Sequence, residues 1–380
     1  MKYKIAISTG FGLEAVLKRE LYQELGVKDA PANGGMVRIE GDEETVARCN
    51  LYLRTAERVY IVPAEGEVTT FDQLFVLVSS VRWADLLPQN ARIIVNGKSV
   101  ASTLFGVSAC QSITKKAIVV SLQRAYRVEQ LPETGPTYQI TVSLLKDYAT
   151  ILVDTSGTGL HKRGYRELVG EAAIKETMAA GLLLLSIWNK DKPLIDPFCG
   201  SGTIPIEAAL IARRIAPGLY RNFAFESWPQ FAPSLMDDLR KEAEGRIDRT
   251  STLHIAGFDI DPNAIKLCRH HAKRAGVESD VHFQCMDMRQ VSSHTPYGVI
   301  VTNPPYGERL LTEKEVGKLM QDFSAVFRAL PKWSCYVITA FAFMERYFGR
   351  KADKNRKLYN GKLECRYYQF MGEKPPKKEN

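Results

Sequence analysis

The stretch PLIDPFCGSGT (193–203) decides the fold that we expect for the second half of this chain. It indicates a short buried strand that runs into two glycines and then into a helix from Thr203 to about residue 214. Gly200 and Gly202 let the backbone turn tightly and approach a ligand, because no Cβ stands in the way. The start of the helix adds free N–H groups. We therefore predict a binding loop at the carboxyl end of the first strand of an α/β sheet.

Strands and helices alternate through the rest of this half. We expect a helix at 167–189 before the first strand, then strands at 254–260, 281–287, 298–305 and 334–341, with helices at 263–277 and about 313–330. This alternation predicts a mostly parallel, Rossmann-like sheet with helices on both faces. Asn360-Gly361 between two strand-like runs predicts an antiparallel hairpin at its end. Residues 215–252 indicate an insertion.

The first half predicts two smaller α+β units. Residues 1–65 follow the order strand, helix, strand, helix, strand, which is typical of a ferredoxin-like unit. Residues 66–155 form a second unit, with helices at 71–81 and 107–126 and strands at 92–98, 137–144 and 148–155. We expect a linker at 156–166, the Rossmann-like domain at 167–372 and a basic tail at 373–380.

Composition narrows the class of protein. The 380 residues are 45% hydrophobic and 25% charged, as in a soluble protein of two or three domains. No apolar run is long enough to span a bilayer, and the N-terminus is not a signal peptide, so we expect a cytoplasmic protein with no membrane partner. The seven cysteines form no C-x-x-C pair and predict neither disulfides nor zinc. Cys268, His270 and His271 share one helix without facing one another, so we expect no metal there.

The charge indicates an anionic partner. The net charge is +8 and the pI is about 9.0. Residues 346–380 hold 11 Lys/Arg against 4 Asp/Glu, and tyrosines and Phe348 lie between the basic residues. A basic surface of this kind favours nucleic acid, although a solvated tail would have a similar composition.

The glycine loop differs from two common nucleotide-binding motifs. Pro205 stands where a dinucleotide fingerprint has its third glycine, which disfavours NAD, and the G-K-[ST] of a P-loop is missing. Asp259 ends the second strand, where a carboxylate can accept hydrogen bonds from ribose hydroxyls. The alternative for Asp259 is a helix N-cap, although Asp261 before Pro262 suits that better. Asp287 ends the third strand, and we expect it to accept from an adenine amine.

Met288 follows Asp287 and is placed to cover the adenine ring.

The fourth strand then ends in Asn303-Pro304-Pro305-Tyr306. The prolines make the chain rigid, so the Asn303 side-chain oxygen and the Pro304 carbonyl can accept from one exocyclic amine. Tyr306 offers a face on which a base can stack. This arrangement predicts methyl transfer to a nucleobase amine by positioning, with the base flipped out or unpaired. The alternative is a turn that merely ends the strand.

Together these motifs resemble the class I S-adenosylmethionine (SAM)-dependent amino-methyltransferases, whose fourth-strand motif is [DNS]-P-P-[YFW]. In the first half, TGFGLEAVLKREL (9–21) and VNGKSVASTLFGVSACQSITKKAI (95–118) look like the entry helix and THUMP domain of the THUMP-containing RNA methyltransferases. TSGTGLHKRGYRE (155–167) looks like the linker of the bacterial large-subunit rRNA guanine-N2 methyltransferases. The resemblance covers about residues 1–372, although some family members carry a second methyltransferase domain.

The resemblance implies SAM as cofactor and structured RNA as substrate. Its motifs place five residues around the methionine part of SAM: Asp196, Phe198, Gly200, Gly202 and Thr203. It assigns Asp259 and Ile260 to the ribose, Asp287 and Met288 to the adenine, and 303–306 to the target base.

The basic residues of the first half supply the candidates for RNA contact. They are Lys98, Lys115, Lys116, Lys162, Arg163 and Arg166, and ordinary surface charge is the alternative for each. The function we expect is formation of N2-methylguanosine in 23S rRNA. Three alternatives remain: a DNA adenine-N6 methyltransferase, a tRNA guanine-N2 methyltransferase, and a non-catalytic RNA-binding assembly factor.

Overall fold

The computed structural model describes residues 1–166, 174–305, 312–361 and 363–374. The chain divides into two compact units. Unit 1 comprises Met1–Thr9, Glu20–Leu160 and Arg221–Lys241, and unit 2 comprises Gly10–Arg19, His161–Tyr220 and Glu242–Asn380. Among the described residues, no helix is both long enough and apolar enough to cross a membrane.

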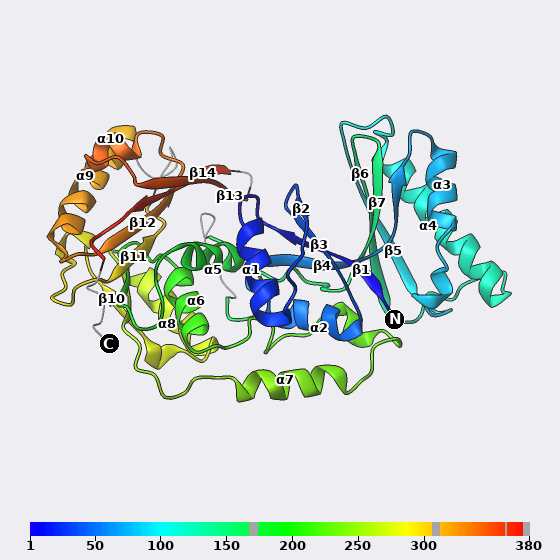
Figure 1. The fold of residues 1–380 in the computed structure, drawn as a ribbon, viewed down its shortest axis with the longest axis horizontal. Coiled ribbons are helices and arrows are strands. Elements are labelled where there is room, and N and C mark those ends of the chain that lie inside the picture. Colours follow the sequence, from blue (N-terminus) through cyan, green and yellow to red (C-terminus); the bar gives the residue numbers. More distant parts are fainter. Residues whose placement is uncertain (167–173, 306–311, 362, 375–380) are drawn as a thin grey trace. The chain divides into compact units, whose positions relative to one another are not determined.

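Unit 1 is built on one seven-stranded sheet with the order β2-β3-β1-β4-β7-β6-β5 (Figure 1). All neighbours are antiparallel except β5 and β6, which are parallel and joined by α4. Helix α4 packs on α3 and on β5. The elements of the first half are β1 (Tyr3–Thr9), α1 (Glu14–Leu25), β2 (Ala32–Asn33), β3 (Met36–Gly41), α2 (Glu43–Tyr52), β4 (Ala56–Glu67), α3 (Phe71–Ser79), β5 (Arg92–Val100), α4 (Val107–Tyr126), β6 (Thr137–Leu145) and β7 (Tyr148–Asp154).

Strand β4 joins the two α+β units that the sequence predicts as separate. It pairs with β1 along its first half and with β7 along most of its length. Its register with β7 shifts between Ile61 and Ala64, on either side of Pro63. A proline has no N–H to donate to the ladder, so it belongs at such an irregularity. The two predicted units therefore share a single sheet.

The aromatic part of the predicted insertion packs in unit 1. The indole of Trp228 stacks on the ring of Tyr138, with centroids 4.2 Å apart and planes at 19°. Its Nε1 donates to the carbonyl of Thr137 over 3.2 Å. Residues 221–241 thus contribute to the core of unit 1, whereas the sequence places them within the domain at 167–372.

Unit 2 has a second seven-stranded sheet with the order β10-β9-β8-β11-β12-β14-β13 (Figure 1). Strands β8 to β12 are parallel, and β14 and β13 close the sheet as an antiparallel hairpin, as predicted. The elements of the second half are α5 (Glu176–Leu185), β8 (Leu194–Asp196), α6 (Thr203–Ala212), α7 (Leu235–Gly245), β9 (Ile255–Asp259), α8 (Pro262–Arg274), β10 (Val281–Cys285), β11 (Val299–Thr302), α9 (Glu313–Ala329), β12 (Ser334–Thr339), α10 (Met344–Phe348), β13 (Lys354–Asn360) and β14 (Leu363–Phe370).

The helix predicted over 167–189 is shorter in the structure. Residues 167–173 lie outside the described part of the chain, and α5 runs from Glu176 to Leu185. Ser186 ends it, because its hydroxyl donates to the carbonyl of Leu183 and accepts from the N–H of Trp188. A serine that offers the backbone such local partners favours a turn over a further helical turn.

The start of β11 is tightly packed, because a Cβ at Gly298 would overlap the indole of Trp333. That indole is 2% exposed and its Nε1 donates to the carbonyl of Thr295 over 2.7 Å. We expect Gly298→Ala to lower the free energy of unfolding by about 1–3 kcal/mol, the usual cost of overpacking a core, measured by urea unfolding. Gly245→Ala is the control, since a Cβ there meets nothing within 4 Å. Equal stability of the two variants would contradict this packing.

Candidate functional site

The loop after β8 has the conformation that its glycines require. Gly200 has φ +52° and Gly202 has φ +80°, both in the left-handed region that side chains disfavour. A Cβ on Gly200 would point into open space, whereas one on Gly202 would lie 3.1 Å from the sulfur of Cys268. Gly202 precedes the first residue of α6, Thr203, which is buried. The loop therefore leaves the backbone at Gly200 without a covering side chain, next to open space and just before the start of α6.

Asp196 ties this loop to the neighbouring strand. Its carboxylate accepts a hydrogen bond of 2.6 Å from the hydroxyl of Thr302, the last residue of β11. It also accepts from the backbone N–H of Phe198 over 3.2 Å. Burial raises the pKa of Asp196 to about 7, and these two hydrogen bonds oppose the shift.

Asp259 lies at the end of β9 and holds the glycine loop. Its carboxylate accepts from the N–H of Gly200 over 2.9 Å and from the N–H of Asp261 over 3.0 Å. Asp261 is the N-cap of α8, so the alternative role for Asp259 is wrong. Ile260 beside it is 69% exposed, which leaves an apolar surface at this strand end. Each carboxylate oxygen has a second lone pair, so Asp259 keeps the capacity to bind a hydroxyl.

The third strand end differs in part from the prediction. Asp287 already accepts from the N–H and the guanidinium of Arg289, at 2.9 and 2.8 Å. Met288 is 4% exposed and belongs to the hydrophobic core of unit 2, so its predicted place over an adenine ring is not available. Met286, two residues earlier, is only partly buried at the same strand end.

Asn303 has the feature that most directly indicates a ligand. Its side-chain oxygen is buried, and it has no hydrogen-bond partner among the described residues. A buried amide oxygen without a partner costs about 1–3 kcal/mol, so a ligand donor is its natural partner. Pro304 is buried and Pro305 partly so, while Tyr306 lies outside the described residues.

The sheet brings these strand ends together. β8 pairs with β9 on one side and with β11 on the other, all parallel. The carboxyl ends of parallel strands lie at one edge of the sheet. Asp196, Asp259 and Asn303 therefore lie at the same edge. Phe198, from the glycine loop, packs edge-on against Phe323 of α9, with centroids 5.4 Å apart.

The basic residues predicted to contact RNA divide into two groups. Lys98 on β5 and Lys116 on α4 are exposed, Lys115 is partly exposed and pairs with Glu133 over 3.0 Å, and Lys162 is exposed. These four remain predictions.

The predicted contact of Arg163 and Arg166 with RNA is wrong. The Arg163 side chain is 3% exposed and lies 3.7 Å from Glu207, and that of Arg166 is 4% exposed and lies 3.3 Å from Glu176. Both are buried in ion pairs within unit 2. Guanidinium groups buried to this degree are not exposed for contact with an RNA backbone.

No group of three or more His, Cys, Asp or Glu side chains could hold a metal ion within the described ranges. The ring of His271 is instead buried, with Nδ1 3.1 Å from the carbonyl of Ser201. Sequence reasoning missed Thr302, which fixes Asp196. Its position directly before Asn303 was the available signal.

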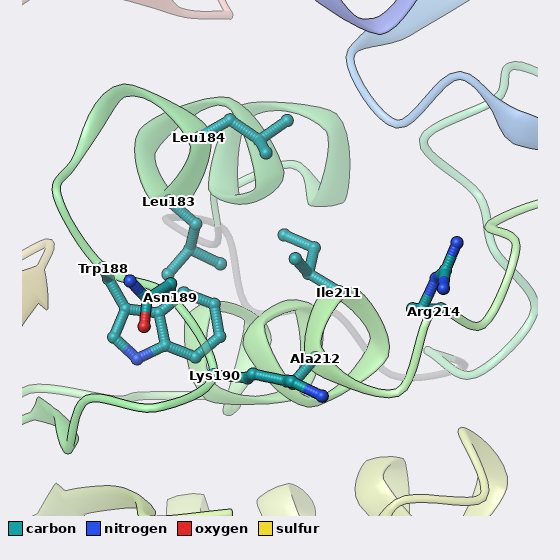
Figure 2. A pocket seen from close by; sticks show the side chains of 8 residues that line it. All are labelled: Leu183, Leu184, Trp188, Asn189, Lys190, Ile211, Ala212 and Arg214. Atoms are coloured by element: carbon teal, nitrogen blue, oxygen red, sulfur yellow. The ribbon is translucent and has the colours of Figure 1, made fainter. Parts of the chain in front are cut away.

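The structure also has a cavity of about 380 Å³. Figure 2 shows the side chains that line it. Its lining comes from the ends of α5 and α6 and from Trp188, Asn189 and Lys190 before β8. Helix α6 begins at the glycine loop and ends at this cavity, about 15 Å away at 1.5 Å per residue. Lys190 is already paired with Asp248 over 2.8 Å. We therefore assign the cavity no part in the site.

The raised pKa of Asp196 gives a test of its burial. The pKa of this carboxyl rises from 3.8 in the unfolded chain to about 7 in the folded protein, and the rise stabilises the folded state at low pH. The stabilising contribution is fully present below about pH 3.8. This contribution is lost as the pH rises through about 7. We expect the melting temperature of the parent protein to fall relative to that of Asp196→Asn between about pH 5 and pH 8, measured by circular dichroism. A difference that stays constant over this range would contradict the assignment.

Sequence models of three families match the chain. They are the RlmL ferredoxin-like domain at residues 4–60, the THUMP domain at 68–154 and the RMKL-like methyltransferase domain at 163–369. These matches confirm the fold class that the sequence predicts, with its ferredoxin-like, THUMP and methyltransferase parts. The exact predicted boundaries stay predictions.

Relatives match over the whole chain. The Bacillus subtilis protein named "Putative RNA methyltransferase YpsC" is 42% identical over all of this chain and 98% of its own length. A crystal structure of SMU.472 complexed with SAH is 43% identical, with a TM-score of 0.94 and 99% of each chain covered.

A third relative is the crystal structure of a "predicted N6-adenine-specific DNA methylase" from Listeria monocytogenes. It is 44% identical, with a TM-score of 0.93, over 98% of this chain and 97% of that one. With a methyltransferase domain over more than half of its residues and relatives that match end to end, the chain belongs to the THUMP-containing RMKL-like methyltransferases.

Proposed function

We propose that this protein transfers a methyl group from SAM to the N2 amine of a guanine in 23S rRNA. The observation that carries the proposal is the buried Asn303 oxygen, which has no partner among the described residues and lies at the strand end next to the glycine loop. An exocyclic amine supplies the donor that this oxygen needs.

The cofactor is SAM, and the residues of the loop fit it. The open space at Gly200 and the bare backbone beside it leave room for the methionine part. Asp259 and the exposed Ile260 suit a ribose hydroxyl and an apolar ring edge. Asp287 remains our candidate for the adenine amine. The relative SMU.472 was solved with SAH, which supports this assignment.

The chemistry that this site needs is positioning. SAM supplies an electrophilic methyl group on a sulfonium. The Asn303 oxygen and the Pro304 carbonyl accept the two N–H groups of the target amine and turn its lone pair toward the methyl group. Holding two reactants in line accounts for much of the acceleration in such reactions. Tyr306 remains the predicted stacking face for the flipped base.

The choice of RNA over DNA rests on the first half of the chain. The THUMP match and the name of the B. subtilis relative support RNA. The choice of large-subunit rRNA is supported by the resemblance of residues 155–167 to the linker of the large-subunit rRNA guanine-N2 methyltransferases. The name of the Listeria relative points to adenine N6 in DNA. Asn303 and Pro304 would serve both targets, because both are exocyclic amines.

The test is transfer of labelled methyl from SAM to three acceptors: an unmodified 23S rRNA transcript, unmodified tRNA and unmethylated duplex DNA. Nucleoside digestion and mass analysis then identify the product. We expect N2-methylguanosine in rRNA. N6-methyladenine in DNA, or N2-methylguanosine in tRNA alone, would overturn the proposal.

Asn303→Ala tests the acceptor directly. We expect kcat to fall about 100-fold, the scale seen when one preorganised hydrogen bond to a transition state is lost. The SAM dissociation constant should stay within about twofold of the parent value. Asn303→Asp keeps an oxygen acceptor and should retain more activity than the alanine variant. Full activity of Asn303→Ala would exclude this role.

Gly202→Ala tests the loop. Its Cβ would crowd Cys268 and Phe283, both at 3.1 Å or slightly more, and strain the backbone at φ +80°. We expect the SAM dissociation constant to rise at least about tenfold, measured by calorimetry. The control is Gly276→Ala, which has φ +71° but nothing within 4 Å of its Cβ. It should cost about 1–2 kcal/mol of stability and leave SAM affinity unchanged.

A further inference from the structure

The end of the hairpin β13–β14 lies at the same edge of the sheet as Asn303. Thr302 is opposite Val337 on β12, and Thr339 at the end of β12 is opposite Arg366 on β14. Lys357 on β13 is opposite Arg366 in turn. Neighbouring strands lie about 4.8 Å apart, so β14 is about 10 Å and β13 about 14 Å from β11. This hairpin end is therefore a few nucleotides from the site of the target base.

Residues from the other end of the chain are held against this hairpin. Arg356 donates to the carbonyl of Gly12 over 2.8 Å. Gly12 has φ +89°, and a Cβ there would lie 2.7 Å from the carbonyl oxygen of Lys357. Only glycine allows so close an approach. In Figure 1 the start of α1 and the hairpin lie beside each other accordingly.

This contact places an aromatic pair at the surface. Phe11 is 56% exposed, and its ring centroid is 6.1 Å from that of Tyr359, with the planes at 66°. A turn that only covered the edge strand would bury its large side chain. Phe11 leaves more than half of its surface in solvent.

Basic side chains lie on the hairpin beside the pair, although the acidic Glu364 is directly opposite Tyr359. The ammonium group of Lys357 lies 5.4 Å from the ring centroid of Tyr359, and Arg366 is exposed opposite Lys357. Residues 354–366 contain five Lys/Arg and one acidic residue, Glu364. Lys357 and Glu364 form an ion pair of 2.7 Å, but both side chains are at least half exposed, so the pair is weak and easily exchanged for a phosphate.

We propose that this end of the hairpin, with Phe11 packed on it, binds an unpaired stretch of RNA next to the target nucleotide. We call the four side chains involved the hairpin surface: Phe11, Lys357, Tyr359 and Arg366. Bases stack on Phe11 and Tyr359, and phosphates pair with Lys357 and Arg366. Exposed aromatic faces interleaved with cations are the usual means of holding single-stranded nucleic acid. The inference rests on the proposed function for its substrate, and it adds that this substrate is single-stranded beside the target.

Two measurements test the hairpin surface in the full-length protein. The first is methyl transfer to the 23S rRNA transcript. We expect Phe11→Ala and Tyr359→Ala each to raise KM at least about fivefold, the lower end of what one base–aromatic stack contributes, with kcat and SAM affinity changed less than about twofold. The second is fluorescence anisotropy with a labelled 12-nucleotide single-stranded RNA, which does not depend on chemistry. The same variants should weaken this binding.

Matched variants distinguish stacking of a base on Phe11 from simple coverage of the edge strand by an apolar side chain. Phe11→Tyr keeps an aromatic face and should behave as the parent, whereas Phe11→Leu keeps apolar bulk and should fail like Phe11→Ala. Tyr220→Ala removes another exposed aromatic of unit 2, 67% exposed, and should change nothing.

The outcomes distinguish the two proposals. Unchanged RNA affinity in Phe11→Ala and Tyr359→Ala, or equal behaviour of Phe11→Leu and Phe11→Tyr, would overturn the hairpin surface even if rRNA is methylated. A parent protein that leaves rRNA unmethylated, with RNA binding weakened in the two alanine variants, would overturn the proposed function and keep the hairpin surface.

Discussion

The hydrogen bond between Thr302 and Asp196 joins the two halves of the site. It links the end of β11, where Asn303 begins, to the end of β8, where the glycine loop begins. The bond is 2.6 Å long and buried, so it fixes one loop relative to the other inside the sheet. Asp259 then holds the glycine loop from the opposite neighbour, through the N–H of Gly200. A methyl donor and its acceptor must meet in one line, and these two carboxylates set the loops that would carry them.

The carboxylates of the site have hydrogen-bond partners within the protein, whereas the side-chain oxygen of Asn303 has none among the described residues. The partnered carboxylates are those of Asp196, Asp259 and Asp261, and the Asn303 oxygen is buried. Buried polar atoms without a partner are uncommon in folded proteins, and each needs an explanation such as a ligand or a bound water. The rigid prolines after Asn303 prevent the chain from relaxing to satisfy it. The asymmetry therefore favours a binding role for Asn303 over a turn that merely ends the strand.

Local sequence patterns predicted the features that depend on neighbouring residues, such as strands, helices, turns and caps. They did not predict which side chains are buried, because burial depends on residues elsewhere in the chain. The order of strands and helices in unit 2, the hairpin at Asn360-Gly361 and the cap at Asp261 follow from periodicity and turn chemistry. The burial of Arg163 and Arg166 does not, because a basic residue shows its charge in the sequence but not its partner. Glu207 and Glu176 lie elsewhere in the chain. Met288 failed for the same reason, since only the packed structure shows that it belongs to the core.

Methylation of 23S rRNA through Asn303 is tested most directly in cells that lack this protein, with the wild type or Asn303→Ala returned on a plasmid. The measurement is nucleoside analysis of their 23S rRNA. We expect one N2-methylguanosine to disappear from the rRNA, to return with the wild-type protein and to stay absent with the variant. An rRNA with unchanged N2-methylguanosine, or a return of the modification with Asn303→Ala, would contradict this expectation.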